Sequence, residues 1–400
     1  MNCGPLLRVA QITTDARGTL VPVEQSTPAF GTAPEALLQG FSMCPDEVEV
    51  HVISCVPKPV SAPEKLASNI YFHSLVVPML GWRAGFLGCA LAVRSRLRTI
   101  RPDVVHGQGT ERDCAMGAVF SGAPNLLTIH GNMQRLARLA NAPPFSYAWI
   151  VARLERFVLP RTNGVICITR HTESEVNRFV RRHWLVPNAV DHTFFPVVSQ
   201  PAKPPVAVCI ASIGALKNQN ELIRALDPIG VKNSFILAFH GVHGSDTYGE
   251  TFRRLIEERS WCQYRGFAPR ADLKRILAEA TMLILPSLEE NCPMVVLEAM
   301  AAGVPVLASN VGGIPDLIEH GVTGMLFDPA NASSIRAAVQ EVLENPGLRQ
   351  NLAAKAKASA LSRFQPEIIA RRHLQIYREM LNRAEEPLSA RAEKLVPNLR

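Results

Sequence analysis

Short apolar runs and longer amphipathic segments alternate along most of the chain. The apolar runs LLRVAQIT (6–13), VEVHVIS (48–54) and VAVCIAS (206–212) have the length of buried strands. The segment GFLGCALAVRSRLRTI (85–100) has the spacing of an amphipathic helix and ends on basic residues, as helix C-termini prefer. Strands that alternate with helices predict parallel sheets, so we expect an α/β fold class.

Two such α/β halves follow one another along the chain. The segment VVSQPAKPPVA (197–207) is rich in proline, which is typical of a linker. We therefore expect an N-terminal domain over 1–196 and a C-terminal domain over 205–365. Residues 383–400 have no clear place in either domain, so we expect a loose tail. The first strand is not followed by Gly-x-Gly-x-x-Gly, which counts against a dinucleotide-dependent oxidoreductase.

The stretch PSLEENCPMVVLEAMAAGVPVLASNVGGIP (286–315) has a loop–helix–strand pattern, and the short apolar run TMLIL (281–285) precedes it as a strand. Pro293 stands at the expected first position of the helix, and Gly303 is a stop signal after it. In a parallel unit of this kind, the loop and the helix N-terminus lie at the carboxyl edge of the sheet. Exposed N–H groups and the helix dipole favour an anion there, usually a phosphate.

Two glutamates frame this predicted anion site. Glu290 lies in the loop and Glu298 lies within the helix. A carboxylate repels a phosphate but accepts hydrogen bonds from a diol, so sugar hydroxyls are its natural partners here. The alternative is that Glu289 and Glu290 are solvated loop charges and that Glu298 is an exposed helix residue.

The same stretch, PSLEENCPMVVLEAMAAGVPV followed by GGIPD, resembles the signature of family 4 of the nucleotide-sugar glycosyltransferases. The resemblance implies the GT-B fold, in which two doubly wound Rossmann-like domains face each other across a cleft. It also implies that Glu298 binds the nucleotide ribose and that Glu290 lies against the donor sugar. The remaining donor-binding residues that it implies in this stretch are Asn291 and Cys292, through their backbone, and Met294 and Val295.

A second stretch of the C-terminal half resembles the phosphate-binding motif of the same family. Lys217 matches the lysine that binds the donor phosphates, but the usual Gly-Arg pair falls on Ala211-Ser212. The arginine is therefore absent, and we expect Ser212, Asn218 or another arginine to compensate for it.

Other matches extend the resemblance over nearly the whole chain. The backbone near Gly266, Phe267 and Ala268 would lie by the nucleobase. WLVPNAVDHTFF (184–195) resembles a stretch that closes the first domain, with Ala189 in place of the usual glycine. The segment at about 366–382 resembles the terminal helix that crosses back to the first domain.

The N-terminal half carries fewer matches. His130 follows the strand-like NLLTIHGN (125–132), at a position where α/β sheets bind ligands. The family has a histidine there that touches the donor sugar, although a lone histidine is usually structural. His106 also matches a family position, and Gly31-Thr32 matches a glycine-rich loop that faces the donor phosphates and the acceptor.

The composition places the chain among globular proteins and indicates a compartment. Hydrophobic residues make up 47% and charged residues 19% of the 400 residues, which is ordinary for such a protein. The nine cysteines have no zinc-binding spacing, and the N-terminus resembles no signal peptide. Residues 76–93 are too short and too interrupted for a confident membrane span. We expect a cytoplasmic protein.

Positive charge is concentrated in one part of the chain. Residues 82–182 hold 15 arginines against 6 acidic residues, an excess of nine in a chain whose net charge is +7. This excess indicates an anionic partner, such as a phospholipid surface, a lipid-linked phosphate or nucleic acid; the alternative is ordinary solvated helix faces. The arginines expected to share helix faces or helix ends are Arg94, Arg98 and Arg101, and Arg178, Arg181 and Arg182.

The resemblance implies a hexosyltransferase-type enzyme that moves a sugar from a nucleotide sugar to a hydroxyl acceptor with retained configuration. A front-face route fits best, because the sequence offers no convincing nucleophile. We expect no cofactor, no metal and no nucleic acid, but a sugar or lipid-linked acceptor at the inner face of a membrane, in bacterial polysaccharide or glycolipid synthesis. Two alternatives stay open: a sugar-nucleotide epimerase of the same architecture, and a non-catalytic sugar-nucleotide binding protein.

Overall fold

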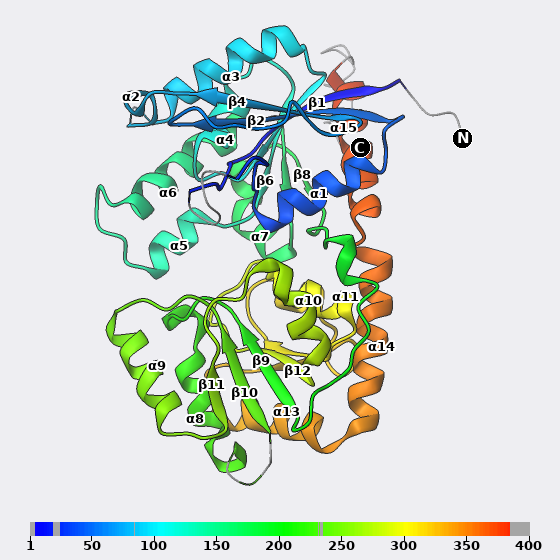
Figure 1. Ribbon diagram of the computed structural model, residues 1–400. Coiled ribbons are helices and arrows are strands. Elements are labelled where there is room, and N and C mark those ends of the chain that lie inside the picture. Colours follow the sequence, from blue (N-terminus) through cyan, green and yellow to red (C-terminus); the bar gives the residue numbers. More distant parts are fainter. Residues whose placement is uncertain (1–4, 19–24, 84, 231, 233–234, 385–400) are drawn as a thin grey trace, which may run out of the picture. The chain divides into compact units, whose positions relative to one another are not determined.

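The computed structural model describes residues 5–18, 25–83, 85–230, 232 and 235–384 (Figure 1). Contacts group the chain into two compact units. The first unit comprises the described residues up to Ile168, Thr172–Val186 and the segment from Glu367 onward. The second unit comprises Thr169–His171 and Pro187–Pro366. The expected loose tail 383–400 lies almost entirely outside the described residues.

The first unit is built on an eight-stranded sheet in the order β3-β4-β2-β1-β5-β6-β7-β8. The pair β3–β4 is antiparallel and the other neighbouring pairs are parallel. The strands are β1 (Leu7–Ile12), β2 (Val48–Val56), β3 (Lys65–Ala67), β4 (Ile70–Val76), β5 (Val104–Gln108), β6 (Asn125–Ile129), β7 (Val165–Cys167) and β8 (His183–Leu185).

Helices connect these strands, and one core cluster lies between helices and sheet. Val105, Leu127 and Val165 of three neighbouring strands pack in this cluster with Val93 and Leu97 of α3. The helices are α1 (Thr32–Ser42), α2 (Met79–Arg83), α3 (Leu87–Ile100), α4 (Asp113–Val119), α5 (Met133–Leu139), α6 (Tyr147–Val158), α7 (Arg170–Val176) and α15 (Pro366–Ala384). The first two residues of α7 and the first residue of α15 are grouped with the second unit.

The expected grouping of arginines on helices is wrong at two places. Arg101 is the C-cap of α3 and has a left-handed backbone (φ 51°), so it does not share a helix face with Arg94 and Arg98. The helix expected around Arg178 ends at Val176, because the chain passes through a short 3-10 turn and then turns into the edge strand β8. Arg181 and Arg182 therefore lie outside any helix.

The second unit contains a six-stranded parallel sheet in the order β11-β10-β9-β12-β13-β14. Its strands are β9 (Val206–Ile210), β10 (Ile236–His240), β11 (Cys262–Tyr264), β12 (Met282–Leu285), β13 (Val306–Ser309) and β14 (Met325–Phe327). Its helices are α8 (Gln219–Gly230), α9 (Thr247–Glu257), α10 (Arg270–Glu279), α11 (Met294–Ala302), α12 (Ile314–Leu317), α13 (Ala332–Glu344) and α14 (Pro346–Arg363). The sequence patterns did not predict α14.

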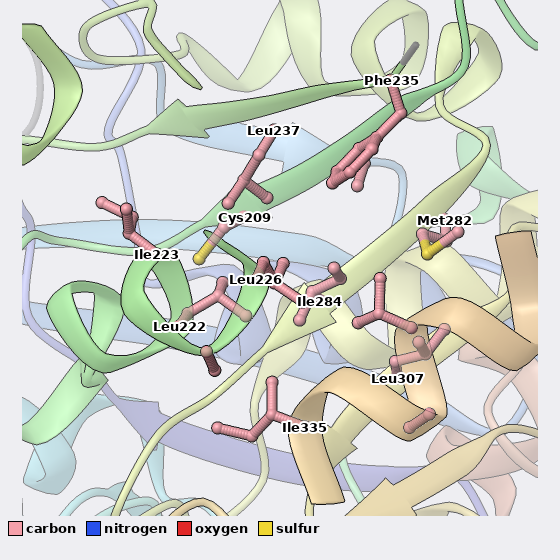
Figure 2. Packing of buried hydrophobic residues seen from close by; sticks show 14 of the residues in the cluster. Cys209, Leu222, Ile223, Leu226, Phe235, Leu237, Met282, Ile284, Leu307 and Ile335 are labelled. Carbon is pink, nitrogen blue, oxygen red and sulfur yellow. The ribbon is translucent and has the colours of Figure 1, made fainter. Parts of the chain in front are cut away.

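The core of the second unit explains why its strands read as nearly continuous apolar runs. Strands covered by helices on both faces bury every side chain, and all four residues of β12 are buried. Figure 2 shows Cys209 and Ile284 of the sheet near Leu222 and Leu226 of α8, and Ile335 of α13 belongs to the same cluster. The expected α/β class with doubly wound parallel sheets is confirmed for each unit.

The expected linker is an ordered part of the second unit. Gln200 N–H donates 2.7 Å to the Ala278 carbonyl and Ala202 N–H donates 2.9 Å to the Glu279 carbonyl, so the segment runs along the end of α10. The preceding Val190 N–H donates 2.9 Å to the Phe364 carbonyl. Residues from Pro187 onward thus pack with the second unit.

Each sheet has a point where the strand order reverses. The first strand of the second unit, β9, lies between β10 and β12, and β1 likewise lies between β2 and β5. In doubly wound sheets, ligands bind outside the carboxyl ends of the strands at such points. No helix in the described part of the chain is long and apolar enough to cross a membrane.

Candidate functional site

The loops that follow β9 and β12 bring Lys217 and Glu290 together at the switch point of the second unit. Lys217 ends a short 3-10 turn, and its Nζ donates a hydrogen bond to Glu290 Oε1. Ser287 Oγ donates 2.7 Å to the same carboxylate oxygen. The two loops are also joined by the backbone, because Leu288 N–H donates 2.8 Å to the Leu216 carbonyl. The Lys217 side chain is 28% exposed and that of Glu290 is 11% exposed, so solvent or a ligand can reach the lysine.

Two glycines after β13 hold the Glu290 loop from the other side. Gly313 N–H donates 3.0 Å to the Glu290 carbonyl. A Cβ at Gly312 would lie 1.9 Å from the Glu290 carbonyl oxygen, and one at Gly313 would lie 1.9 Å from that of Asn291. Only glycine permits this approach, and Gly312 also has a positive φ of 55°. The Gly-Gly pair of the sequence signature therefore shapes the loop that carries Glu290.

The first turn of α11 leaves its backbone N–H groups without a side-chain cap. Its N-cap is Pro293 and the helix begins at Met294, one residue later than expected; Pro293 makes no side-chain capping bond. Met294 and Val295 are partly buried. Uncapped N–H groups at a helix N-terminus attract an anion. This end of α11 directly follows the loop that carries Glu290.

The neighbouring loop residues are held in place by the protein. Thr169 Oγ1 donates 2.8 Å to Asn291 Oδ1, and His171 Nε2 lies 3.0 Å from Glu289 Oε1. Cys292 is buried, and burial raises the pKa of its thiol to about 12, so the thiol is not a nucleophile. The interpretation of Glu289 and Glu290 as solvated loop charges is wrong, because both carboxylates are paired.

Glu298 is buried inside α11 and pairs with Arg270 of α10. Its side chain is 3% exposed, and its Oε1 accepts 2.7 Å from Arg270 Nη1. Arg270 Nη2 also lies 3.4 Å from Asp191 Oδ2, and the guanidinium stands 5.5 Å from the centroid of the Phe194 ring. Burial raises the pKa of Glu298, and the charge of Arg270 opposes this rise. The alternative of an exposed helix residue is wrong for Glu298.

Sequence reasoning did not identify Arg270 or Asp191. Asp191 lies in the PNAVD stretch that was recognised for another reason, so its position could have been noted. Arg270 has no motif of its own, since it follows Pro269 at the start of α10. Only the packing of α10 against α11 shows that it faces Glu298.

The residues expected near a nucleobase border a separate cavity of about 300 Å³. Gly266 has a positive φ of 74°, and its carbonyl accepts 2.9 Å from Gly241 N–H. Phe267 is 62% exposed, and its side chain lines the cavity with Arg265 and His240. His240 Nε2 is buried and has no hydrogen-bond partner among the described atoms, so it is free to bond with a ligand.

Ser212 lies in the loop after β9 and is exposed. Its carbonyl accepts 2.9 Å from Gln219 Nε2, which fixes the loop ahead of Lys217. Asn218 is buried and donates to the Pro329 carbonyl at 3.1 Å, so its side chain holds the turn.

The predicted residues of the first unit lie at two of its loops. His130 follows β6, and its Nε2 lies 2.9 Å from Gln108 Oε1. Burial lowers the pKa of His130 to about 4, so its ring is neutral near pH 7. Gly31 is the N-cap of α1 and Thr32 is its first residue. Residues 19–24 of the loop before them lie outside the described part.

His106 has a different environment and faces the interior of the first unit. Its Nδ1 lies 2.7 Å from the Tyr377 hydroxyl of α15, and its Nε2 lies 2.7 Å from Thr128 Oγ1. Burial holds the pKa of His106 well below its usual value. His106 thus joins the sheet to α15.

The described residues contain one group with the spacing of metal ligands. Cys55, Cys89 and Asp113 are buried in the first unit, and their ligand atoms lie within 4.8 Å of one another. None of the three belongs to the predicted donor-binding residues. The eight described cysteines are free thiols.

Two family models match the chain one after the other. The model described as Glycosyltransferase Family 4 matches residues 43–194, and the model described as Glycosyl transferases group 1 matches residues 191–359. Together they cover both units.

Curated relatives include several glycosyltransferases. An uncharacterised glycosyltransferase of Methanocaldococcus jannaschii is 32% identical over 40% of this chain and 42% of its own length. The O-antigen chain mannosyltransferase B of Escherichia coli is 30% identical over 38% of this chain and 41% of its length. The chain thus matches less than half the length of these two relatives. The 2-deoxystreptamine N-acetyl-D-glucosaminyltransferase of Streptomyces fradiae is 24% identical over 78% of this chain and 79% of its own length.

Solved structures show the same fold over nearly all of the chain. A sucrose-phosphate synthase from Thermosynechococcus elongatus has a TM-score of 0.75 at 18% identity and covers 94% of this chain and 100% of that one. Anabaena HepE in complex with UDP-glucose has a TM-score of 0.66 at 18% identity, with coverages of 94% and 100%.

Proposed function

Because the chain belongs to glycosyltransferase family 4 and has the GT-B fold, we propose that it transfers a sugar from a nucleoside-diphosphate sugar to a hydroxyl group. The observation that carries the proposal is the Lys217–Glu290 pair at the switch point beside the uncapped N-terminus of α11. One cation and a set of free N–H groups suit a diphosphate, and an adjoining carboxylate suits a sugar hydroxyl.

Lys217 serves the diphosphate without leaving Glu290. A lysine ammonium has three N–H donors, and the described contacts use one of them for Glu290. The other two can donate to phosphate oxygens. Lys217 and the backbone N–H groups of Met294 and Val295 then stabilise the charge that grows on the leaving diphosphate. The loss of one such contact typically costs about 3–4 kcal/mol in the barrier.

Glu290 positions the donor sugar. Its carboxylate is oriented by Ser287 and Lys217, which both bond to Oε1. The other oxygen, Oε2, is the one that accepts a hydrogen bond from the sugar. The backbone of Asn291 and Cys292 adjoins the same position.

Glu298 binds the ribose diol. Arg270 occupies Oε1, and the described contacts place no hydrogen bond on Oε2, which leaves that oxygen for the ribose. The charge of Arg270 opposes the rise that burial causes in the pKa of this carboxyl. The nucleobase lies by Gly266 and Phe267, over the cavity that His240 lines. UDP and UDP-glucose are bound in the HepE structures, and the same donor class is proposed here.

The reaction proceeds with retention by a front-face route, in which the leaving diphosphate takes the proton of the incoming hydroxyl. No metal is assigned to the donor, because the donor-binding residues offer one lysine and backbone N–H groups rather than a carboxylate cluster. We assign acceptor binding to the first unit, where the Gly31-Thr32 loop belongs. His130 is neutral and therefore acts as a hydrogen-bonding group, not as a cation.

The acceptor is a sugar or a lipid-linked sugar at the cytoplasmic face of a membrane. This assignment rests on the excess of arginine in residues 82–182 and on relatives such as the O-antigen chain mannosyltransferase B. Products of this kind belong to polysaccharide or glycolipid synthesis.

The test begins with a panel of nucleotide sugars and thermal unfolding. A ligand at 100 times its dissociation constant adds about 2.7 kcal/mol of stability. The true donor should therefore raise the unfolding temperature more than the other nucleotide sugars do. The stabilising donor is then incubated with and without acceptor sugars, and the products are read by mass spectrometry. Transfer to an acceptor is expected. Conversion of the donor without an acceptor would instead indicate an epimerase, and binding without any turnover would indicate a binding protein.

A further inference from the structure

The first unit contains a cavity of about 690 Å³ that the proposed transfer reaction does not use. It lies between α5, α6 and the turn that follows α7. Its walls include Trp149, Arg153 and Arg156 of α6, together with Arg178 and Phe179 of the turn. Arg138 of α5 also lines the cavity, so the lining combines four arginines with two aromatic rings.

Three of these arginines, Arg153, Arg156 and Arg178, are held on aromatic faces and have no carboxylate partner among the described residues. The Arg153 guanidinium stands 4.8 Å from the centroid of the Trp149 ring. Phe179 is contacted by two guanidinium groups, that of Arg178 at 4.7 Å and that of Arg156 at 6.0 Å. Stacking on a ring orients a guanidinium and leaves its N–H edge available.

The acidic residue of the cavity is already neutralised. Glu175 accepts 3.0 Å hydrogen bonds from both Arg135 and Arg138. The cavity thus keeps the positive charge of Arg153, Arg156 and Arg178 without an internal counter-ion. A hollow with several oriented N–H groups and uncompensated positive charge fits a phosphate group.

Exposed apolar side chains surround the same elements. The tip between α5 and α6 places Phe145 at 81% exposure and Tyr147 at 64%. The Phe145 ring lies 5.4 Å from that of Trp149, so the apolar tip is continuous with the cavity wall. The exposed large apolar residues of this hairpin are Leu136, Leu139, Phe145, Tyr147, Ile150 and Phe157.

We propose that the α5–α6 hairpin docks on a membrane and that the arginine cavity binds the phosphate of an anionic lipid headgroup. A soluble phosphate compound would need the arginines but would gain nothing from exposed apolar rings beside them. A bilayer interface satisfies both features, because apolar and aromatic side chains enter the headgroup region while arginines contact phosphates. Figure 1 shows the α5–α6 hairpin projecting from the sheet of the first unit.

This proposal assigns the membrane contact to one surface. It does not depend on the proposed transfer reaction, since its test measures binding and not turnover. It also differs from an effect of overall charge, because Arg94, Arg98 and Arg101 carry the same charge elsewhere in the unit, at α3 and its C-cap.

The experiment is co-sedimentation with vesicles of phosphatidylcholine alone or with phosphatidylglycerol, at low and high salt. We expect salt-sensitive binding to the anionic vesicles alone. The cavity variant R153Q/R156Q/R178Q should lose binding on the order of 100-fold, since each basic residue near an anionic surface contributes roughly a factor of five. The matched control R94Q/R98Q/R101Q removes the same charge. Its loss of vesicle affinity should be less than a tenth of the loss in the cavity variant.

Two further variants and one probe complete the test. F145S/Y147S should weaken binding without changing its salt dependence, because it removes apolar contact only. Circular dichroism of all variants must match the wild type, and donor-induced thermal stabilisation reports on the second unit separately. Equal loss in the two arginine variants, no preference for anionic vesicles, or a cavity variant that loses affinity for inorganic phosphate but keeps vesicle binding would each overturn the proposal.

Discussion

The second unit holds two carboxylate–cation pairs whose environments differ. Lys217–Glu290 joins two loops, and its lysine is partly open to solvent. Arg270–Glu298 joins two helices, and its glutamate is nearly completely buried. The first pair stands where charge would develop during transfer, whereas the second has a fixed arginine and a buried carboxylate whose pKa is raised. Lys217 has further N–H donors for a ligand while it stays bonded to Glu290, whereas the loss of Arg270 would leave the buried Glu298 carboxylate without its cation.

The difference assigns separate tasks to the two pairs. Lys217 and Glu290 should act on turnover, since the proposed reaction places them against the groups that react. Glu298 and Arg270 should act on donor affinity, since the ribose does not change during transfer. Interactions that are equal in the ground state and the transition state alter binding alone. The following experiments can break or sharpen this division.

The largest effect is expected for Lys217→Ala. Transfer should fall on the order of 100- to 1000-fold in kcat/KM, because the leaving diphosphate loses its cation. Steady-state kinetics with the identified donor measures this, and Lys355→Ala on the exposed face of α14 is the matched control. If Lys217 served only to neutralise Glu290, the double variant K217A/E290A would recover to the activity of Glu290→Ala alone, and the phosphate role would be wrong.

Glu290→Ala should lower kcat roughly 10- to 100-fold and leave the donor dissociation constant nearly unchanged. The expected size is that of a hydrogen bond to a charged group, about 1.5–3 kcal/mol. Single-turnover kinetics gives the rate, and calorimetry gives the affinity. A parallel loss of affinity would show that Glu290 contributes to ground-state binding and would remove the contrast with Glu298.

Glu298→Ala should show the opposite pattern. The donor dissociation constant should rise roughly 10- to 100-fold, because the ribose diol loses its acceptor. Calorimetry with the nucleoside diphosphate alone isolates the ribose contribution from that of the sugar. Equal affinity in wild type and variant would contradict the ribose assignment.

Arg270→Gln should have a smaller effect of the same kind, about tenfold or less. Arg270 is 33% exposed, so solvent screens part of its interaction with Glu298. Glutamine keeps one N–H donor for the carboxylate and removes the charge. Donor affinity measured near neutral pH should fall less than in Glu298→Ala, and a larger loss would mean that Arg270 contacts the donor directly.

The smallest effect is a pH dependence. Burial raises the pKa of Glu298 above its ordinary value. As the pH is lowered, donor affinity should therefore begin to fall at a higher pH than it would with a solvated glutamate. The contribution of Glu298 to the stability of the unliganded protein should instead increase as the pH is lowered. A raised folded-state pKa contributes stability that is present below the unfolded-state pKa and is lost as the pH rises through the folded-state pKa.

Glu298→Gln is the control for this prediction, because it removes the titrating group while keeping its shape. Calorimetry and thermal unfolding between about pH 4 and 7 should show both trends in the wild type and neither in the variant. The same pH dependence in both proteins would assign it to another group.

The sequence predicted the parts of the molecule that depend on local patterns. The strands at 6–13, 48–54 and 206–212 were expected within a few residues of β1, β2 and β9. The strand–loop–helix–strand unit was expected with Pro293 at the helix start and Gly303 at its end, and Gly303 does adopt a left-handed backbone. Apolar periodicity and the conformational limits of proline and glycine act over a few residues, which is why these features can be read directly.

Predictions of where a helix ends were less successful. Arg101 was expected on a helix face but terminates α3, and the helix before Arg181 stops at Val176. The whole of α14 was not predicted, because its alanine-rich sequence has a weak amphipathic pattern. Where a chain must turn into the next strand, tertiary packing decides against local helix preference.

The sequence by itself determined the α/β class, the β12–α11 unit and the candidate residues Lys217, Glu290 and Glu298. Only the tertiary structure decided that Lys217 pairs with Glu290, 73 positions away, and that Glu298 is joined through Arg270 to Asp191. The same holds for the cavity where Arg156 of α6 and Arg178 stack on Phe179. Such contacts arise from the order of strands in a sheet and the packing of helices on it, which no local period in the sequence encodes.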